Sequence, residues 1–244
     1  MSGSWNQADW PAPGNIIAGS TTRSGGISAG VYESLNLGAH VGDDAACVAD
    51  NRRRFLEMCG LPSEPAWLNQ VHGTTVYMLG KNTVSEADAA IGRRAGDTVA
   101  VLTADCLPIL LCSADGSEIA ALHCGWRGLA AGIVAATVTR METTPATLIA
   151  WLGPAISQSA FEVGSEVRAA FVTPDARAES CFEPNERGRW QADLYELGRQ
   201  HLAAAGVDAI YGGGACTFSA RERFFSYRRD GQCGRMATFV HRRE

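Results

Sequence analysis

Three short, almost wholly apolar runs stand in the middle of the chain, at residues 98–103, 107–112 and 118–123. Runs of this length and composition predict buried β-strands, because they are too short for ordinary helices and lack a polar face. Turn-forming residues 113–117 separate the last two runs. We therefore expect those two strands to form a hairpin.

Helical patterns alternate with further strand patterns on both sides of this hairpin. Residues 43–59 predict a helix that Asp43 or Asp44 could cap at its start and Gly60 could end. The first 40 residues mix short apolar pieces with turn formers, which is typical of short strands joined by loops. We expect further helices at residues 128–141, 163–171 and 193–205, and further strands at 147–152, 209–212, 224–227 and 236–240. Interleaved strands and helices predict an α/β or α+β layered fold.

Composition narrows the class of protein further. Of the 244 residues, 46% are hydrophobic and 19% are charged, which is typical of a globular chain. The net charge is −5 and no basic stripe is present, so we expect no nucleic-acid partner. No apolar stretch approaches the roughly 20 residues that cross a bilayer, and the first 14 residues do not resemble an export signal. Eight cysteines without a CxxC pair then indicate reduced thiols and a cytoplasmic location.

The organisation of the chain predicts one domain. No repeat, low-complexity segment or Pro/Ser-rich linker divides residues 1–244. Residues 1–16 are expected to be a loosely ordered segment at the N-terminus. No heptad or unpaired apolar helix offers a partner face, so we expect a monomer.

The candidate chemistry centres on Cys106 and His123. If Asp115 is the centre of the hairpin turn, residue 123 faces residue 107, so Cys106 and His123 converge at one end of the hairpin. His72 ends another short run and is followed by a glycine that lets the chain turn away. Two imidazoles and one thiolate are a suitable ligand set for zinc with an open fourth position, and copper would also bind.

Two other interpretations of these residues stay open, because their spacing is not that of a zinc module. Cys106 and a histidine could be a nucleophile and its base. They could also be a core cysteine beside hydrogen-bonded histidines. Asp105, next to the thiol, and Asp88 are the candidates for proton transfer or for orienting a ligand histidine. Either carboxylate could instead cap a turn.

Arginine-containing loops surround these positions and offer a site for an anion. Arg127 lies in a Gly-Trp-Arg-Gly segment directly before an alanine-rich helix, where backbone N–H groups are free. Arg23 precedes two glycines, and Arg228 and Arg229 form a third cluster. A guanidinium can bind phosphate or carboxylate through two parallel hydrogen bonds. Each arginine could equally be a solvated surface residue.

These motifs resemble the signature segments of the YfiH family, the bacterial laccase-domain family. The likeness runs in colinear order from about residue 17 to residue 240 and includes residues 22–26, 35–38, 69–73, 103–108, 123–128, 152–154, 162–164, 216–217 and 225–230. Two positions depart from the usual pattern. Cys124 replaces a small residue, and strand alternation should point it away from His123. Phe161 replaces a frequent tyrosine.

The resemblance implies a single layered α/β/β/α domain with mixed sheets. It also implies a metal, usually taken as zinc, held by residues matching His72, Cys106 and His123. The expected catalytic residues are Asp105, Asp88 and Arg127. We expect substrate binding by Arg23, Asn36, Gln70, Arg228 and Arg229.

The resemblance implies an enzyme, for which three activities are described. The first is phosphorolysis of adenosine, inosine and methylthioadenosine to the free base and ribose 1-phosphate, together with adenosine deamination. The second is amide hydrolysis that removes a misincorporated serine from a UDP-muramoyl precursor in the cytoplasm. The third is copper-dependent polyphenol oxidation. The chain lacks the His-x-Glu and Pro-Cys-x-x-Cys segments of common zinc deaminases, and its five histidines form no His-x-His pair. We therefore expect a zinc-dependent purine nucleoside phosphorylase whose partners are a nucleoside and phosphate.

Overall fold

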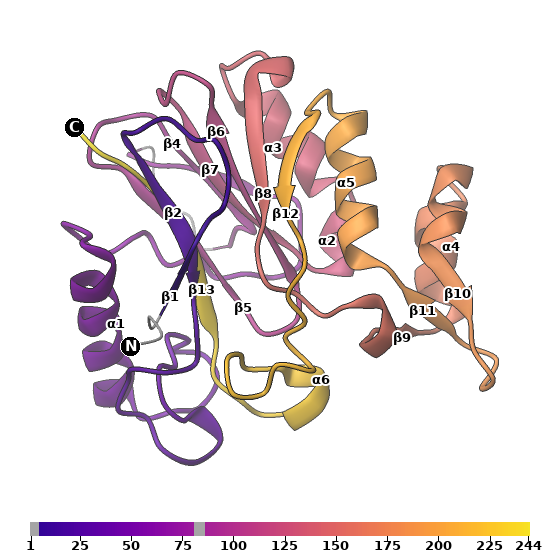
Figure 1. Cartoon of the computed structure of the whole chain (residues 1–244), viewed down its shortest axis with the longest axis horizontal. Helices are drawn as coiled ribbons and strands as arrows, with labels where there is room; N and C mark the ends of the chain where they lie inside the picture. The colour runs from indigo at the N-terminus through magenta and orange to yellow at the C-terminus, as the bar shows by residue number, and fades with distance from the viewer. Residues whose placement is uncertain (1–4, 81–85) are drawn as a thin grey trace.

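The computed structural model describes residues 5–80 and 86–244, and two mixed or antiparallel β-sheets form its centre (Figure 1). In spatial order, the first sheet contains β1 (Trp5–Gln7), β2 (Ile16–Thr21), β13 (Met236–Arg242) and β5 (Thr98–Thr103). The second contains β12 (Ala209–Gly212), β8 (Leu148–Leu152), β6 (Leu107–Ser113), β7 (Ile119–Cys124), β4 (Ala89–Gly92) and β3 (Val76–Met78). The chain therefore builds its sheets from strands that are distant in the sequence.

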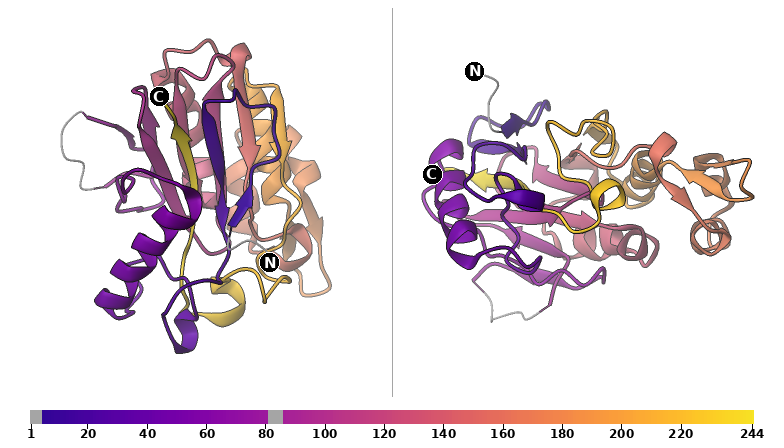
Figure 2. Two further views of the ribbon diagram at one scale, coloured as in Figure 1. Left: turned by 60° about the vertical axis from the view of Figure 1, so that its left-hand side comes forward. Right: turned by 90° about the horizontal axis from the view of Figure 1, so that it is seen from below.

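Six α-helices are described: one covers the outer face of the first sheet, three cover the outer face of the second, and the other two lie beyond the ends of these layers (Figure 2). They are α1 (Ala45–Cys59), α2 (Trp126–Ala130), α3 (Ile133–Arg140), α4 (Ser165–Val172), α5 (Leu194–Ala204) and α6 (Tyr227–Asp230). Short 3-10 helices occupy Gly30–Tyr32, Pro145–Thr147, Gln158–Ala160 and Ala176–Cys181. Asp44 accepts hydrogen bonds from two backbone N–H groups at the start of α1, and Gly60 ends it in the left-handed conformation. The caps expected from the sequence are confirmed there.

The apolar side chains form layers that follow strand alternation. Leu110 and Cys112 of β6 face the first sheet and pack with residues such as Val101 and Val240. Ile109 and Leu111 of the same strand face the helices. Because β6 is buried on both faces, its sequence is a continuous apolar run. Phe55 of α1 packs on the outer face of the first sheet. The expected α/β/β/α layering is confirmed.

Two of the expected elements are wrong in detail. The helix predicted at residues 128–141 is divided into α2 and α3, because Gly132 adopts a left-handed conformation (φ 96°) between them. The strand predicted at residues 224–227 is absent from the described residues. Phe224 and Phe225 are completely buried, and Ser226 instead caps α6 by accepting a hydrogen bond from the Arg229 N–H. An apolar run thus signals burial there without signalling a strand.

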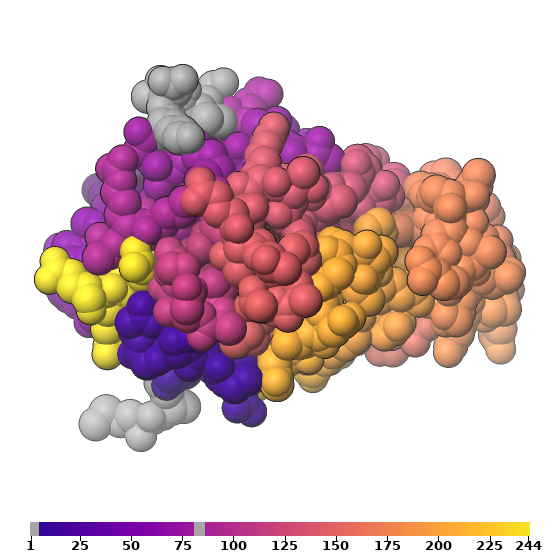
Figure 3. Space-filling model, turned by 90° about the horizontal axis from the view of Figure 1, so that it is seen from above, coloured from indigo at the N-terminus to yellow at the C-terminus, as the bar shows by residue number. Residues whose placement is uncertain are grey.

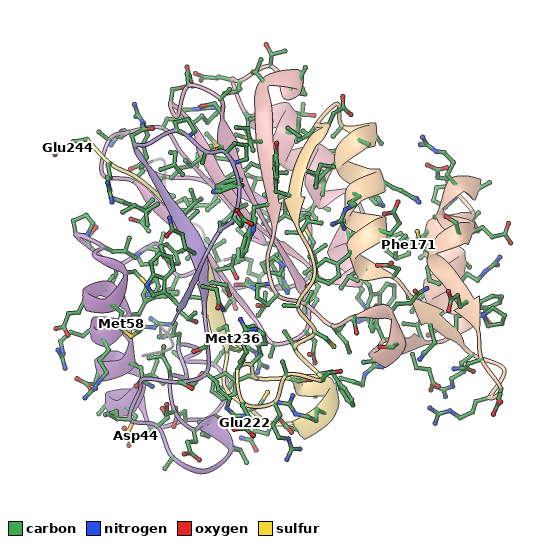
Figure 4. All side chains as sticks on the ribbon, in the orientation of Figure 1. Asp44, Met58, Phe171, Glu222, Met236 and Glu244 are labelled. Carbon is green, nitrogen blue, oxygen red and sulfur yellow. The ribbon has the colours of Figure 1, made fainter. Side chains whose placement is uncertain are left out.

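A small third sheet was not predicted from the sequence. It contains β10 (Phe182–Pro184), β11 (Trp190–Ala192) and β9 (Glu162–Val163), so that the helix expected from residue 163 begins only at Ser165. With α4, this sheet forms a lobe at one end of the molecule (Figure 3). Phe171 lies on the face of α4 that is turned toward α5 (Figure 4), where its ring meets the His201 ring edge to face with centroids 5.8 Å apart.

Two further expectations are corrected by strand pairing. His123 pairs with Pro108, and Leu107 pairs with Cys124, so the predicted hairpin register is displaced by one residue. Within the segment expected to be loosely ordered, residues 5–7 form β1 and pair with β2, which orders them through backbone hydrogen bonds; residues 1–4 lie outside the described residues. The expectation of a single domain stays a prediction. None of the helices described is both long enough and apolar enough to span a membrane.

Candidate metal centre

Three ligand-type side chains meet where the hairpin strands leave the core. His72 lies in the loop before β3, Cys106 lies between β5 and β6, and His123 lies in β7. Their ligand atoms all lie within 4.8 Å of one another, and Cys106 Sγ is 3.7 Å from His72 Nε2. His123 is buried, Cys106 is half-buried and His72 is exposed. The cluster is therefore held by the core on one side and is open to solvent on the other.

Two glycines next to β7 make room for this cluster. A Cβ atom at Gly125 would lie 2.5 Å from His72 Cδ2 and 3.2 Å from Cys106 Sγ. A Cβ atom at Gly128 would lie 3.0 Å from the carbonyl oxygen of Gly73. The contact with His72 is shorter than a Cβ atom tolerates, and the other two are tight enough that the neighbouring atoms would have to shift, so the convergence of the ligands depends on these positions.

Asp88 connects two of the three ligands. Its completely buried carboxylate lies 2.8 Å from His123 Nδ1 and accepts hydrogen bonds from the backbone N–H groups of Val71, His72 and Gly73 at 2.7–3.2 Å. Burial raises the pKa of this carboxyl group, but the His123 ring and the backbone donors outweigh burial and lower it. An ionised Asp88 keeps the proton on His123 Nδ1, which leaves Nε2 as the ligand atom.

Charge within the cluster favours an anionic sulfur. Burial raises the pKa of Cys106, but the nearby His123 charge and hydrogen bonds from both histidines lower it to about 6. Burial lowers the pKa of His123, but the Cys106 thiolate and Asp88 raise it to about 9. Without a metal, the pair is thus a thiolate beside an imidazolium.

The donor set fits a metal such as zinc or copper. One thiolate and two imidazoles lie close enough together for one ion, and three protein ligands leave a coordination position open. The carboxylate behind His123 is the outer partner that metal-binding histidines usually have. The geometry therefore supports a metal centre over the alternative of a core cysteine beside unrelated histidines.

Asp105 lies beside Cys106 in sequence, but its carboxylate accepts hydrogen bonds from a distant part of the chain. It accepts hydrogen bonds from Thr217 Oγ1 at 2.6 Å, from Ser226 Oγ at 3.0 Å and from the Arg228 N–H at 2.7 Å. Its backbone is left-handed, with φ at 93°. Asp105 thus fixes the segment around α6 against the loop that carries Cys106. Its expected role in proton transfer stays a prediction.

Of the predicted substrate-binding arginines, Arg23 and Arg229 are occupied by backbone carbonyls. The Arg229 guanidinium donates to the carbonyls of residues 217, 218 and 224 and pairs with Asp230. Arg23 donates to the carbonyls of Glu33 and Arg221 and stacks on the Phe225 ring. Both side chains hold loops together.

Arg127 and Arg228 are more available for an anion. Arg127 is exposed, stacks on the Trp126 ring, and has no hydrogen-bond partner for its guanidinium among the described residues. Arg228 is also exposed, donates one hydrogen bond to the carbonyl of Glu162 and stacks on Phe161. Arg127 directly follows the segment that contains Gly125, and the Arg228 N–H is bound to Asp105. Each arginine therefore extends from a segment that contacts the loop carrying Cys106.

Asn36 and Gln70 are both engaged within the protein. Asn36 is completely buried, accepts hydrogen bonds from the N–H groups of Gly38 and Arg235, and donates to Gly38 O and Asp43 Oδ2. Gln70 exchanges two hydrogen bonds of 2.7 Å with the backbone of Leu102 in β5. Gln70 thereby fixes the loop that carries His72 against the first sheet.

Sequence reasoning missed two features near the cluster. It assigned no steric role to Gly125, although a glycine directly after a candidate ligand can indicate that other side chains pack against the backbone there. It also assigned no role to His40, an exposed histidine whose pKa is lowered in part by the charge of His123. Desolvation lowers the pKa of His40, and Arg235, Arg52 and His123 act in the same direction.

Cys124 does not belong to the ligand cluster. It is completely buried among the apolar residues on the helix-facing side of the second sheet, and burial raises the pKa of its thiol well above the usual value. Alternation along β7 therefore directs Cys124 away from His123, as the sequence indicates.

Comparison with known proteins gives a consistent result over nearly the whole chain. A family model described as "Multi-copper polyphenol oxidoreductase laccase" matches residues 17–243. A purine nucleoside phosphorylase of Pseudomonas aeruginosa is 51% identical over 97% of both chains. The purine nucleoside phosphorylase YfiH of Escherichia coli is 50% identical over 95% of this chain and 96% of its own length.

Solved structures agree with the fold. A Neisseria meningitidis protein superposes with a TM-score of 0.94 at 46% identity, and the match covers 99% of this chain and all of the other. YlmD from Geobacillus stearothermophilus superposes with a TM-score of 0.93 at 34% identity, covering 100% and 98% of the two chains.

Proposed function

Because this chain belongs to the laccase-like family that contains YfiH, we propose that it is a zinc-dependent purine nucleoside phosphorylase. The observation that carries the proposal is the intact His72, Cys106 and His123 cluster in a chain about half identical to relatives of that name. We further propose that adenosine, inosine and methylthioadenosine are its nucleoside substrates and that adenosine deamination is a second activity.

In this proposal the three side chains of the cluster hold the zinc. When bound, zinc supplies a Lewis acid that can polarise a substrate oxygen or lower the pKa of water. Asp88 acts as a positioning residue, because it holds the His123 ring in one tautomer and also fixes the backbone of His72.

The protein's own contribution to phosphorolysis is to place an anion beside the sugar. A phosphate oxygen forms a bond to the sugar carbon C1′, the bond from C1′ to the purine nitrogen breaks, and the purine leaves with the electron pair and takes up a proton. The available guanidinium groups of Arg127 and Arg228 are our candidates for binding the phosphate. Arg23 and Arg229 serve better as structural groups.

The family description mentions several copper ions, but the ligands present favour a single metal. Among residues 5–80 and 86–244, the described side chains contain one cluster of histidine, cysteine or carboxylate groups with metal-binding geometry. Coupled copper centres need several sets of ligands. Phosphorolysis therefore agrees better with this chain than multicopper oxidation.

The proposal is tested by product analysis together with metal analysis. Purified protein is incubated with adenosine, with and without phosphate, and adenine, inosine and ribose 1-phosphate are quantified by chromatography. We expect about one zinc per chain, with adenine and ribose 1-phosphate formed only when phosphate is present. Cys106→Ala should lose both metal and activity, whereas Cys47→Ala, which removes a thiol of α1, should retain both.

The same preparation separates the alternatives. Inosine formed without phosphate would report deamination. Release of serine from a UDP-muramoyl peptide, with no nucleoside turnover, would replace the phosphorylase with the amidase. Replacing Arg127 by glutamine should raise the KM for phosphate about tenfold or more without changing the zinc content, because it removes a charged hydrogen-bond donor.

A further inference from the structure

A crevice of about 340 Å³ lies where β8 and β12 end, apart from the residues of the metal centre. These strands are parallel, so their carboxyl ends open at the same edge of the sheet. The chain that leaves β12 runs along this edge toward α6 (Figure 1). Its lining comes from β1, from the ends of β8 and β12 and from the segments that follow them: Asn6, Trp151, Leu152, Gly153, Pro154, Gly212, Gly213, Gly214, Ala215, Arg223 and Phe224. Crevices at the carboxyl ends of parallel strands are frequent ligand sites.

The body of the crevice is apolar. Trp151 is 7% exposed and Phe224 is completely buried, and both contribute to the lining with Pro154. Gly212 adopts a left-handed conformation, and a Cβ atom there would lie 2.8 Å from Trp151 Nε1. A Cβ atom at Gly214 would meet nothing within 4 Å. Gly212 therefore packs directly against the indole ring, and the open part of the crevice lies beside Gly214.

One end of the crevice carries hydrogen-bond donors without acceptors. Arg223 donates from Nη2 to Asn6 Oδ1 at 2.9 Å. Because a guanidinium only donates, this contact fixes the orientation of the Asn6 amide. Asn6 Nδ2 is then buried and has no hydrogen-bond partner among the described residues. A buried donor of this kind costs free energy unless something accepts its hydrogen bond.

The charge at this end is positive and uncompensated. Arg223 is exposed, stacks on the Phe224 ring, and forms no ion pair with a described carboxylate. No aspartate or glutamate contributes to the described lining. Trp151, another lining residue, carries a further N–H donor at Nε1. The lining thus offers several donors and a positive charge beside a flat apolar surface.

We propose that this crevice is a binding site for a small organic anion that joins one carboxylate to a flat apolar body. The carboxylate accepts hydrogen bonds from Arg223 and, after a small movement of the Asn6 side chain, from Asn6 Nδ2. The apolar body lies against the accessible edge of Trp151 and the backbone of residues 212–214. The volume is within the range of small-molecule sites. The site is separate from the zinc ligands and does not depend on the phosphorylase proposal.

Benzoate is a suitable probe, and benzyl alcohol is its uncharged counterpart of similar size. We expect titration of the zinc-loaded, 15N-labelled protein with benzoate to shift the Trp151 indole signal and the Asn6 side-chain amide signal saturably. Comparison with Trp151→Phe identifies the indole signal among those of the six tryptophans. Benzyl alcohol should bind at least tenfold more weakly, because it brings no negative charge to Arg223.

The variants make the test specific. Arg223→Gln should weaken benzoate binding at least tenfold, as should Asn6→Asp, which places a carboxylate where the free amide donor stood. Arg221→Gln removes a neighbouring exposed arginine that does not line this crevice and should leave binding unchanged. The absence of saturable shifts up to about 50 mM benzoate, equal shifts with benzyl alcohol, or full binding by Arg223→Gln would each overturn the proposal.

Discussion

Asp88→Asn tests whether one buried carboxylate organises the metal centre. In the structure, Asp88 Oδ1 accepts from His123 Nδ1 and the His72 N–H, and Oδ2 accepts from the N–H groups of Val71 and Gly73. An asparagine has one acceptor oxygen and one NH₂ group, so either orientation of its amide turns a donor toward two other donors. Two charge-assisted hydrogen bonds are therefore lost, each contributing about 1.5–3 kcal/mol. We expect the free energy of unfolding to fall by about 3–6 kcal/mol.

Metal affinity should fall as well, because the His123 ring and the His72 backbone lose their common anchor. Loss of an outer partner typically weakens metal binding by about 10–100-fold, which is about 1.4–2.7 kcal/mol. The assay is competition for zinc with a chromophoric chelator, and circular dichroism establishes that the variant is folded. Urea unfolding of the zinc-free protein measures the stability separately.

Glu118→Gln is the matched control. Glu118 is also buried and accepts hydrogen bonds from Arg93 Nε, from Thr143 Oγ1 and from the N–H groups of residues 142 and 143, but it is not among the groups around the metal centre. This variant should lose comparable stability while its zinc affinity stays unchanged. Wild-type zinc affinity in Asp88→Asn, or an equal loss of affinity in Glu118→Gln, would refute the reasoning.

Three further predictions concern individual residues. Gly125→Ala places a methyl group 2.5 Å from the His72 ring. The zinc content of the folded variant, measured by atomic emission, should therefore fall severalfold. A full zinc complement would contradict the packing argument. In the metal-free protein the pKa of Cys106 is lowered to about 6, so its alkylation by iodoacetamide should rise through pH 6. The pKa of Cys47 is raised by desolvation and by nearby carboxylates, so Cys47 should react only at alkaline pH. Parallel pH profiles for the two thiols in mass spectrometry would disprove the thiolate. Arg229→Gln should lower the free energy of unfolding by about 2–4 kcal/mol, because a nearly buried guanidinium donates hydrogen bonds to three loop carbonyls. Wild-type stability in urea denaturation would show that these hydrogen bonds contribute little.

The folded-state charge of His123 also predicts how the metal-free protein responds to pH. Its pKa is raised above the usual 6.5 to about 9, so its contribution to stability is complete below pH 6.5 and is lost as the pH rises through 9. Cys106 contributes the opposite slope over the same range, because its pKa is lowered from the usual 9 to about 6. The two contributions offset each other, so the melting temperature of the chelator-treated protein should change little between pH 6.5 and 9. Cys106→Ala provides the comparison: it removes the opposing contribution while Asp88 still raises the pKa of His123, so its melting temperature should fall over this range.

Local sequence patterns were sufficient to predict those strands and helix ends whose structure depends mainly on neighbouring residues. The continuous apolar runs of β5, β6 and β7 predicted buried strands because both faces of these strands are covered. Asp44 and Gly60 marked the ends of α1 because capping involves only neighbouring residues. The short third sheet escaped prediction, since its strands of two or three residues are defined by their partners rather than by their own pattern.

The sequence by itself determined the layered fold class and the three ligand-type residues of the candidate metal centre, because apolar periodicity and side-chain chemistry are local properties. Only the tertiary structure decided which polar residues are free to act. Arg229 and Arg127 are the same residue type in similar glycine- and aromatic-rich surroundings, yet one is surrounded by carbonyls and the other is exposed. The unpaired amide of Asn6 likewise depends on an arginine 217 residues away. Such long-range contacts arise from packing, which no local pattern encodes.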